Sequence, residues 1–312
     1  MSIPTDPVMV AAADEATATQ PVGEDVHAVS RGRLVLRRFL RRRLAVFGLF
    51  LVVALFLLAF VGPHLTEWRY DTLDYTAVYE PPNGSHWFGT TQVGEDVFAQ
   101  TMRGMQKSLI IGLLAAFLGT GTAALVGAFA GYYAGWVERV LMWIVDLLLV
   151  LPAFLIIAIL SPVFHGKTWL VFVLLLAAFI WMITARVVRG LTMSLKEREF
   201  VQAARFMGVR PTRIIFRHIL PNMASLLIID YTINVGGVIL AETGLSYFGF
   251  GVQPPDVSLG TLIRDGTPAA LTYPWLFQFA GGLLILFVLA VNFVGDGLRD
   301  ALDPNAHSSR AR

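Results

Sequence analysis

The sequence predicts an all-α polytopic membrane protein with six transmembrane helices, and three observations support that class. Of the 312 residues, 56% are hydrophobic and only 15% are charged, a composition outside the range of soluble globular domains. Six apolar segments approach the length of about 20 residues that is needed to cross about 30 Å of hydrocarbon. The basic residues gather in a few segments beside and between these apolar runs.

The six predicted spans contain most of the apolar residues. They lie near residues 44–62, 108–132, 139–160, 168–188, 223–241 and 276–295. Pro152 falls inside the third span and is expected to bend it, because proline removes a helical hydrogen bond. Gly127, Gly131 and Gly135 recur at four-residue intervals, a spacing that lets another helix approach closely.

The distribution of Lys and Arg predicts the orientation. Seven arginines precede the first span: Arg31, Arg33, Arg37, Arg38, Arg41, Arg42 and Arg43. If both termini and the connections after the second and fourth spans face the cytoplasm, that side holds 19 of the 24 Lys and Arg residues. Because cytoplasmic segments of membrane proteins carry an excess of basic residues, both termini are expected in the cytoplasm.

Two longer segments are expected on the outer side. Residues 63–106 are rich in turn-forming residues and are expected to form a small ordered cap. Residues 242–274 contain a stretch in which glycines alternate with aromatic residues. That pattern favours a place at the membrane interface or a re-entrant segment.

The connection at residues 189–221 is the most informative stretch. It is basic and lies between two apolar runs, and it must face water because each charge would cost several kcal/mol in hydrocarbon. A short helix with one apolar face is predicted from the spacing of Phe200, Ala203, Ala204 and Met207. Gly208 is expected to end that helix, Pro211 to prevent its continuation, and residues 214–220 to form a second short helix.

The same connection carries a family resemblance. Gln202-Ala203-Ala204, then Gly208, then Leu220-Pro221 resemble the signature loop of permease subunits in bacterial ABC importers, where a cytoplasmic ATPase docks. Six blocks, in order along the chain, are similar to the C-type permease subunit of oligopeptide and dipeptide ABC importers. They are residues 86–98, 146–152, 194–200, 216–222, 240–255 and 295–304.

The resemblance implies the type I ABC importer permease fold and a set of partners. These are a homologous B-type permease subunit, two cytoplasmic ATPase subunits, an extracytoplasmic peptide-binding protein and a peptide substrate. It places the chain in the lipid bilayer of a bacterial plasma (inner) membrane, where it forms half of a translocation pore for oligopeptides or dipeptides. ATP and Mg²⁺ then bind the ATPase subunits, so no cofactor and no catalytic residue is expected in this chain.

Four regions follow from the spans and the resemblance. They are a disordered cytoplasmic tail with a basic juxtamembrane segment (1–43), a first transmembrane helix with its extracytoplasmic cap (44–107), a permease core that contains the connection 189–221 (108–304), and a cytoplasmic tail (305–312). The first apolar run is expected to remain attached as a membrane anchor.

Seven residues are predicted to couple the chain to its ATPase. They are Gln202, Ala203, Ala204, Met207, Gly208, Leu220 and Pro221. Because Gln202 stands where the general pattern has Glu, docking is assigned to shape and backbone fit, with Gln202 as a neutral hydrogen-bonding group. Small Ala203 and Ala204 are expected to let a cleft of the ATPase approach closely, so that ATPase closure moves the attached spans as a rigid body. The alternative reading of the spacing is an amphipathic helix that lies on lipid.

Polar groups inside the spans give a second set of candidates. Asp230 and Asn234 are four residues apart and share one face of the fifth span, which predicts that they line the translocation path. Asp146 and Pro152, in the third span, are interpreted as structural. The alternative for Asp230 is also structural, a pair with a buried basic group or a backbone donor.

Several other motifs carry no chemistry. Gly166-Lys-Thr168 resembles the end of a phosphate-binding loop but has Ser161 where that loop needs glycine. The six histidines lack the spacing of metal ligands, there is no cysteine, and the basic residues are juxtamembrane, so no metal or nucleic acid is expected. The alternatives are a permease for nickel or another small solute, a proton-coupled secondary transporter that uses Asp146 and Asp230, and a membrane scaffold.

Overall fold

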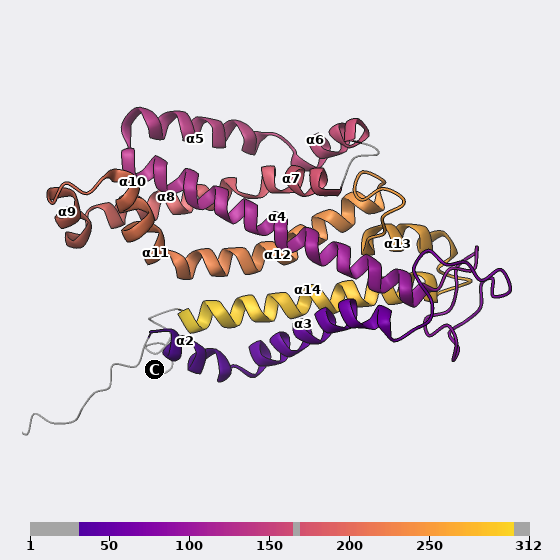
Figure 1. Cartoon of the computed structure of the whole chain (residues 1–312). Helices are drawn as coiled ribbons and strands as arrows, with labels where there is room; N and C mark the ends of the chain where they lie inside the picture. Colours follow the sequence, from indigo (N-terminus) through magenta and orange to yellow (C-terminus); the bar gives the residue numbers. More distant parts are fainter. Residues whose placement is uncertain (1–30, 165–168, 303–312) are drawn as a thin grey trace, which may run out of the picture.

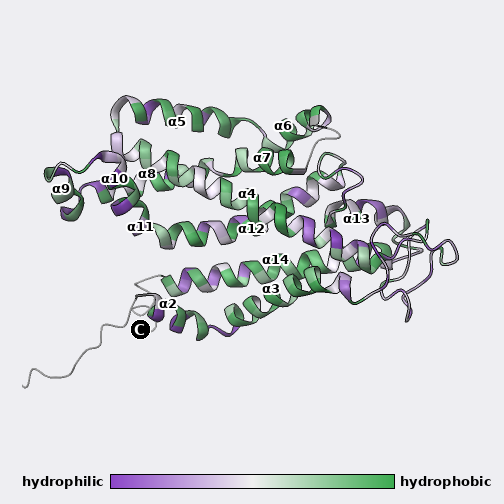
Figure 2. Ribbon diagram, in the orientation of Figure 1, coloured by the Kyte–Doolittle hydropathy of each residue, from purple (hydrophilic) through white to green (hydrophobic). Residues whose placement is uncertain are grey.

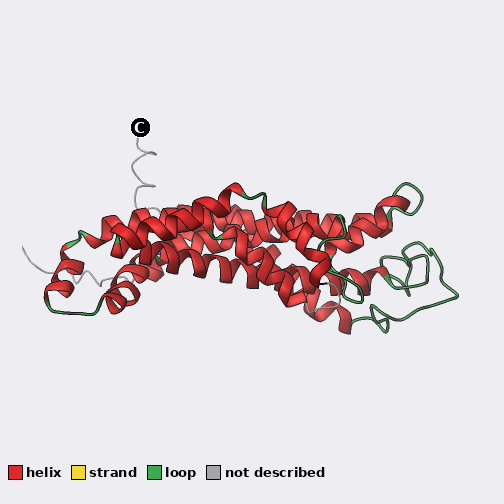
Figure 3. Cartoon of the chain, turned by 90° about the horizontal axis from the view of Figure 1, so that it is seen from above, coloured by secondary structure: helices red, strands yellow, loops and turns green. Residues whose placement is uncertain are grey.

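The computed structural model describes residues 31–164 and 169–302, and within these ranges the chain is helical, with two isolated β-bridges and no strand. The helices run along a common direction and irregular loops gather at one end of the bundle (Figure 1, Figure 3). Residues 1–30 of the predicted N-terminal tail and the predicted tail 305–312 lie outside the described residues. Residues 31–40, which belong to the predicted basic juxtamembrane segment, form a helix.

The elements are as follows. The longer helices are α3 (Arg43–Val61), α4 (Val97–Tyr133), α5 (Gly135–Val150), α7 (Trp169–Ile180), α8 (Met182–Lys196), α12 (Ala224–Tyr247) and α14 (Trp275–Leu302). The shorter helices are α2 (Arg31–Leu40), α6 (Ala153–Leu160), α9 (Glu199–Phe206), α10 (Pro211–Ile214), α11 (Leu220–Asn222) and α13 (Leu259–Gly266). A π-helical turn (Ile215–Ile219) joins α10 to α11. Tight 3₁₀ turns occupy Gly62–His64, Ser161–Phe164 and Thr267–Ala269.

The number of spans agrees with the sequence when broken helices are counted together. Four helices of the described chain, α3, α4, α12 and α14, are each long and apolar enough to cross a membrane. The pairs α5 with α6 and α7 with α8 meet that test only together, and they are bent by 78° and 48°. Counting each pair as one span gives six.

Each bend has a local cause. Pro152 stands between α5 and α6 and has no backbone N–H to donate, so the third predicted span is bent where the sequence places its proline. Between α7 and α8, the Trp181 indole donates a 2.9 Å hydrogen bond to the Ala178 carbonyl oxygen, an acceptor that lies at the bend.

Several helices extend beyond the predicted spans, and α14, which continues to Leu302, is one of them. The second span was predicted from residue 108, but α4 begins at Val97, where the Asp96 carboxylate accepts a 2.7 Å hydrogen bond from the Ala99 N–H. The fourth span was predicted to end at 188 and the fifth at 241, yet α8 continues to Lys196 and α12 to Tyr247. Hydropathy detects the part of a helix suited to hydrocarbon, and these polar extensions pack outside that part.

Helix α4 is the centre of the bundle, and small residues let its neighbours approach. A Cβ on Gly127 would lie 2.5 Å from the carbonyl oxygen of Ala185 in α8, and one on Gly131 would lie 2.6 Å from that of Arg189. These two glycines therefore serve the close packing that their spacing predicts. Gly135 does not, because it lies in the turn after α4 with φ +59° and open space around its Cβ position.

The main hydrophobic core joins α3, α4, α7, α12, α13 and α14. Much of the outward surface of the bundle is also apolar, and Figure 2 shows hydrophobic residues along its middle with hydrophilic residues concentrated toward both ends. This distribution is that of a bundle whose middle is surrounded by hydrocarbon.

The outer segment between α3 and α4 folds into a cap, as the sequence predicts. In the cap, the Nδ1 atom of the buried His86 lies 2.9 Å from an oxygen of the Asp96 carboxylate. The Trp275 indole of α14 donates to the Thr90 carbonyl oxygen at 3.2 Å, and the rings of Tyr79 and Tyr273 stack at 4.0 Å. The cap is thereby attached to the start of α14.

Candidate functional site

The connection predicted at 189–221 lies at the end of the bundle opposite the cap, where Figure 1 shows α9, α10 and α11. Residues 189–196 belong to the last turns of α8, so the projecting part begins at Glu197. We call residues 197–223 the α9–α11 segment. Both of its predicted helices are present, although the second runs from Pro211 to Asn222 rather than from 214 to 220.

A buried cluster attaches this segment firmly to the bundle. From α9, Val201 and Ala204 point inward. From the second helix, three isoleucines pack against them and against α4 and α8: Ile214, Ile215 and Ile219. Since all of these side chains are buried, the base of the segment is part of the packed interior of the bundle.

Gly208 ends α9 as predicted. Its φ is +74°, its N–H donates to the Arg205 carbonyl oxygen at 3.0 Å, and the Val209 N–H donates to that of Ala204 at 3.1 Å. Residues with a side chain rarely adopt this left-handed conformation, which explains the glycine. Pro211 is the first residue of α10, a position where the missing N–H removes no helical hydrogen bond.

The tip of the segment exposes large apolar side chains. Phe206 is 86% exposed and Met207 is 75% exposed. Ala203 is also exposed, but Ala204 is only 2% exposed and packs inward. The expectation that Ala204 contacts a partner is therefore wrong, because α9 presents Ala203 and buries Ala204. An exposed apolar tip on a rigid support is a surface suited to docking.

The other predicted coupling residues belong to the same segment. The Gln202 amide donates a 3.2 Å hydrogen bond to Glu197, Leu220 packs against the buried cluster, and Pro221 is exposed. Five exposed arginines add positive charge to the segment: Arg198, Arg205, Arg210, Arg213 and Arg217. The surface thus combines apolar and basic groups.

Asp230 and Asn234 lie together, but their hydrogen bonds join helices. One Asp230 oxygen accepts from the Thr184 hydroxyl of α8 at 2.6 Å. The other accepts from the Thr120 hydroxyl of α4 at 2.8 Å and from the Asn234 amide at 2.9 Å. This carboxylate therefore has a structural role, because it ties α12 to α4 and α8, but its donors are hydroxyl and amide side chains and not the basic group or backbone donor that was expected.

The second predicted intramembrane acid has a basic partner. Asp146 of α5 accepts a hydrogen bond from the Arg186 guanidinium of α8. Closer to the end of the bundle that carries the α9–α11 segment, Glu138 of α5 pairs with Arg189 of α8 in the same way. These two ion pairs connect α5 with α8 across a surface that is only partly covered.

A buried network at the cap end of the bundle was not predicted from the sequence. The wholly buried Glu242 accepts hydrogen bonds from Ser108 of α4 at 2.9 Å and from Ser246 at 2.7 Å. Ser108 also accepts from the Leu259 N–H of α13 at 3.2 Å. Glu242 was assigned to an outer loop because the fifth span was ended at residue 241. A signal was present, since Glu242 and Ser246 have the spacing of one helical turn.

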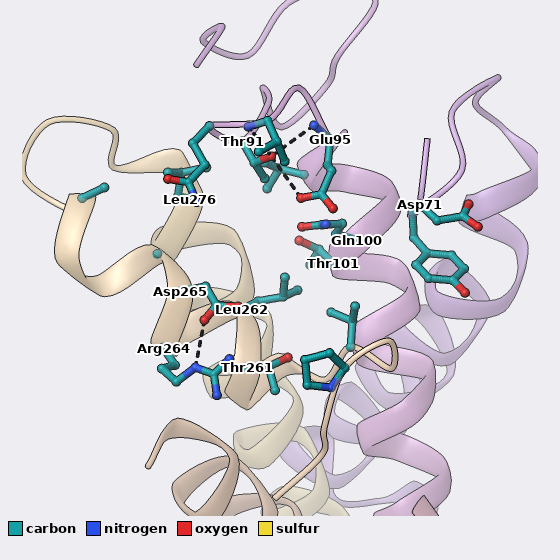
Figure 4. A pocket seen from close by; sticks show the side chains of 18 of the residues that line it. Asp71, Thr91, Glu95, Gln100, Thr101, Thr261, Leu262, Arg264, Asp265 and Leu276 are labelled. Carbon is teal, nitrogen blue, oxygen red and sulfur yellow. Dashed lines mark hydrogen bonds and ion pairs between the residues drawn. The ribbon is translucent and has the colours of Figure 1, made fainter. Parts of the chain in front are cut away.

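A cavity of about 990 Å³ lies between the cap, the start of α4 and α13. Figure 4 shows Glu95, Gln100 and Thr101 along one wall, with Thr261, Arg264 and Asp265 across from them. The Thr101 hydroxyl is buried and has no hydrogen-bond partner within the described chain. The residues that line the cavity come from segments far apart in the sequence, so the cavity could not be predicted from the sequence alone. Across residues 31–164 and 169–302, no three His, Asp or Glu side chains group as metal ligands.

A bundle with four apolar helices long enough to cross a membrane and two bent helix pairs that qualify together is that of a multi-pass membrane protein. The chain belongs to the family described as binding-protein-dependent transport system inner membrane component, which matches residues 123–308. The N-terminal TM domain of oligopeptide transport permease C matches residues 30–82. The family expected from the signature loop is thus confirmed.

Named relatives cover most of the chain. The oligopeptide transport system permease protein OppC of Mycobacterium tuberculosis (strain H37Rv) is 56% identical over 282 residues, which is 90% of this chain and 97% of the relative. A putative peptide permease of Brucella suis is 38% identical over 271 residues, 86% of this chain and 89% of the relative. OppC of Bacillus subtilis is 36% identical over 269 residues, which is 86% of this chain and 87% of the relative.

Proposed function

We propose that this chain forms one half of the translocation pathway of an ATP-driven importer for oligopeptides. The family supports a role in binding-protein-dependent transport, and the names of the relatives support a peptide as the transported solute. The chain itself is a permease subunit, and ATP hydrolysis with its Mg²⁺ belongs to partner ATPase subunits. Nickel and other small solutes are the second class of substrate to test.

The α9–α11 segment carries the proposal. Its exposed tip at Phe206 and Met207 is proposed to enter a cleft of an ATPase subunit, with the surrounding arginines facing acidic groups. Because Ile214 and Ile219 bury the base of the segment against α4 and α8, movement of the ATPase is transmitted to those helices. The glycine at 208 and the alanine at 203 leave room beside the backbone for the partner.

The orientation follows from which elements share an end of the bundle. Helix α2, the α9–α11 segment and the last turn of α14 lie at the end away from the cap (Figure 1). That end carries the basic residues, so it is proposed to face the cytoplasm together with both termini. The cap then faces an extracytoplasmic peptide-binding protein, and a homologous permease completes the pathway.

Reconstitution of the complete complex in proteoliposomes tests this function. The chain is co-purified with its permease, ATPase and binding-protein partners, and uptake of a labelled peptide is measured with ATP supplied on the ATPase side. We expect uptake that requires ATP and the binding protein and that persists when a proton uncoupler is added. Uptake that the uncoupler abolishes at constant ATP contradicts the proposal, as does uptake of Ni²⁺ in place of the peptide.

A further inference from the structure

Asp146 and Arg186 are isolated charges within apolar helices. Asp146 is the only ionisable residue from Val140 to Phe164, and Arg186 is the only one from Trp169 to Val188. Asp146 lies seven residues beyond Arg139 in the continuous helix α5, which places it about 10 Å further into the bundle at about 1.5 Å per residue. The two charges therefore meet at membrane depth.

This ion pair is not covered by the chain itself. The Asp146 side chain is 59% exposed and the Arg186 side chain is 50% exposed. Charged groups at membrane depth face a bundle interior or a water-filled cavity, because contact with lipid is costly. The exposed side of α5 and α8 is therefore not suited to lipid.

Helix α3, at the opposite edge of the bundle in Figure 1, provides the contrast. It contains no ionisable residue after Arg43, and its exposed side chains are apolar, with Phe47 and Phe50 among them. That surface suits lipid. The two edges of the bundle are thus built for different surroundings.

The surface at the ion pair is also concave. A hollow of about 480 Å³ lies between α5 and α8, and five of its lining residues are ionisable: Glu138, Arg139, Asp146, Arg186 and Arg189. Trp143 lines the same hollow and is 63% exposed. A hollow with charged walls at membrane depth can hold water and polar solute.

We propose that this face of α5 and α8 lines the translocation path, and that Asp146 and Arg186 bind the charged termini and main chain of a passing peptide. The inference rests on the proposed function and replaces Asp230 and Asn234 as path-lining residues. The Asp230 carboxylate already accepts three hydrogen bonds within the bundle. Arg186 and Asp146 keep exposed donors and acceptors, and the two together match the carboxylate and ammonium groups of a zwitterionic peptide.

Thiol accessibility in the intact complex tests the location. The chain contains no cysteine, so Trp143→Cys and Phe50→Cys each introduce a single site into this subunit. We expect a membrane-impermeant, charged thiol reagent to modify Trp143→Cys at least about tenfold faster than Phe50→Cys, because the reactive thiolate does not form in hydrocarbon. Modification should respond to ATP and slow in the presence of transported peptide. Leu147→Cys, on the same exposed side of α5, is the second reporter should Trp143→Cys assemble poorly.

The outcomes distinguish a failure of the proposed path-lining face from a failure of the proposed importer function. If the complex imports peptide but neither Trp143→Cys nor Leu147→Cys reacts in any state, the face is buried against the partner permease or lipid and the inference is wrong. If the complex imports no peptide, the proposed function fails whatever the labelling shows. Reaction at both sites with ATP-dependent uptake supports both.

A charge-neutral variant tests the contact with peptide. Asp146→Asn combined with Arg186→Gln keeps polar groups at both positions without leaving one charge unpaired. We expect the KM for a zwitterionic peptide to rise about tenfold, the effect of losing roughly one charge-assisted hydrogen bond, while a peptide with blocked termini is affected less. Equal losses for both peptides, at normal membrane levels of the chain, would show that the pair only joins α5 to α8.

Discussion

Ser108 of α4 and Glu242 of α12 join these two helices through a 2.9 Å hydrogen bond between two buried side chains. The same serine hydroxyl accepts from the Leu259 N–H at the start of α13. One small side chain of α4 therefore connects that helix to α12 and α13, which follow much later in the sequence.

Replacing this serine should destabilise the bundle. Ser108→Ala leaves a Glu242 oxygen and the Leu259 N–H without a partner, at a cost of about 1–3 kcal/mol for each buried group left unsatisfied. We expect a lower thermal denaturation midpoint for the purified protein in detergent. The matched control is Ser225→Ala, the same substitution at an exposed serine, which should leave the denaturation midpoint unchanged. Equal midpoints for the two variants would show that the network contributes nothing.

The positive φ of Gly208 predicts which substitutions the α9–α11 segment accepts. A side chain at this position meets no neighbour within 4 Å, so the penalty comes from the backbone conformation, about 1–2 kcal/mol for an ordinary residue. We expect Gly208→Val to loosen the segment and Gly208→Asn to preserve it, since asparagine tolerates this conformation. The rate of trypsin cleavage at Arg205 and Arg210 measures the difference. Indistinguishable cleavage of the two variants contradicts the prediction.

The close contact between α4 and α8 predicts a contrast between two glycines. Gly127→Ala places a Cβ 2.5 Å from a backbone oxygen and should destabilise the bundle by about 1–3 kcal/mol through overpacking. Gly121→Ala, in the same helix but facing open space, should be neutral or stabilising by up to about 1 kcal/mol. Thermal denaturation of both variants is the measurement. A stable Gly127→Ala variant would mean that α8 can move away from α4 without loss.

The stability of the folded cap should depend on pH through the Asp74 carboxyl group. The hydroxyl and the N–H of Thr76 donate to the Asp74 carboxylate, and these hydrogen bonds lower the pKa of that carboxyl. Because the folded-state pKa lies below the ordinary value of about 3.9, the stabilisation is complete above that value and is lost as the pH falls through the lowered pKa. Thr76→Val removes one donor, so its pKa should rise and the loss should occur at higher pH. Cleavage of the cap by an acid-active protease across this range tests the prediction, and identical pH profiles would refute it.

The sequence predicts the fold well because hydropathy and turn chemistry are local signals. Six apolar runs, the bend at Pro152 and the end of α9 at Gly208 can all be recognised from a few neighbouring residues. The start of α4 and the end of α12 were predicted less well, since these polar turns are held by contacts with α13 and the neighbouring loops. Those contacts join distant parts of the chain and leave no local pattern.

The candidate site was also predicted only in part, because local patterns identify its residues but do not show which distant residues they contact. The signature residues identify the segment that projects from the bundle, but not that Ala204 faces inward while Phe206 is exposed at its tip. The two acidic residues inside the spans could be singled out from the sequence, but the side chains that bind them could not be predicted. Only the packing of α8 shows that Thr184 binds Asp230 while Arg186 binds Asp146 on an exposed side.

The contact between the α9–α11 segment and an ATPase is the central claim, and site-specific crosslinking tests it most directly. Met207→Cys places a single thiol at the exposed tip, and Ser225→Cys serves as a control outside the segment. In the assembled transporter in membranes, we predict that the thiol at 207 crosslinks to an ATPase subunit in high yield and that the yield changes when ATP binds. A thiol at 207 that reacts only with water-soluble or lipid-borne reagents, and never with an ATPase subunit, would contradict the account.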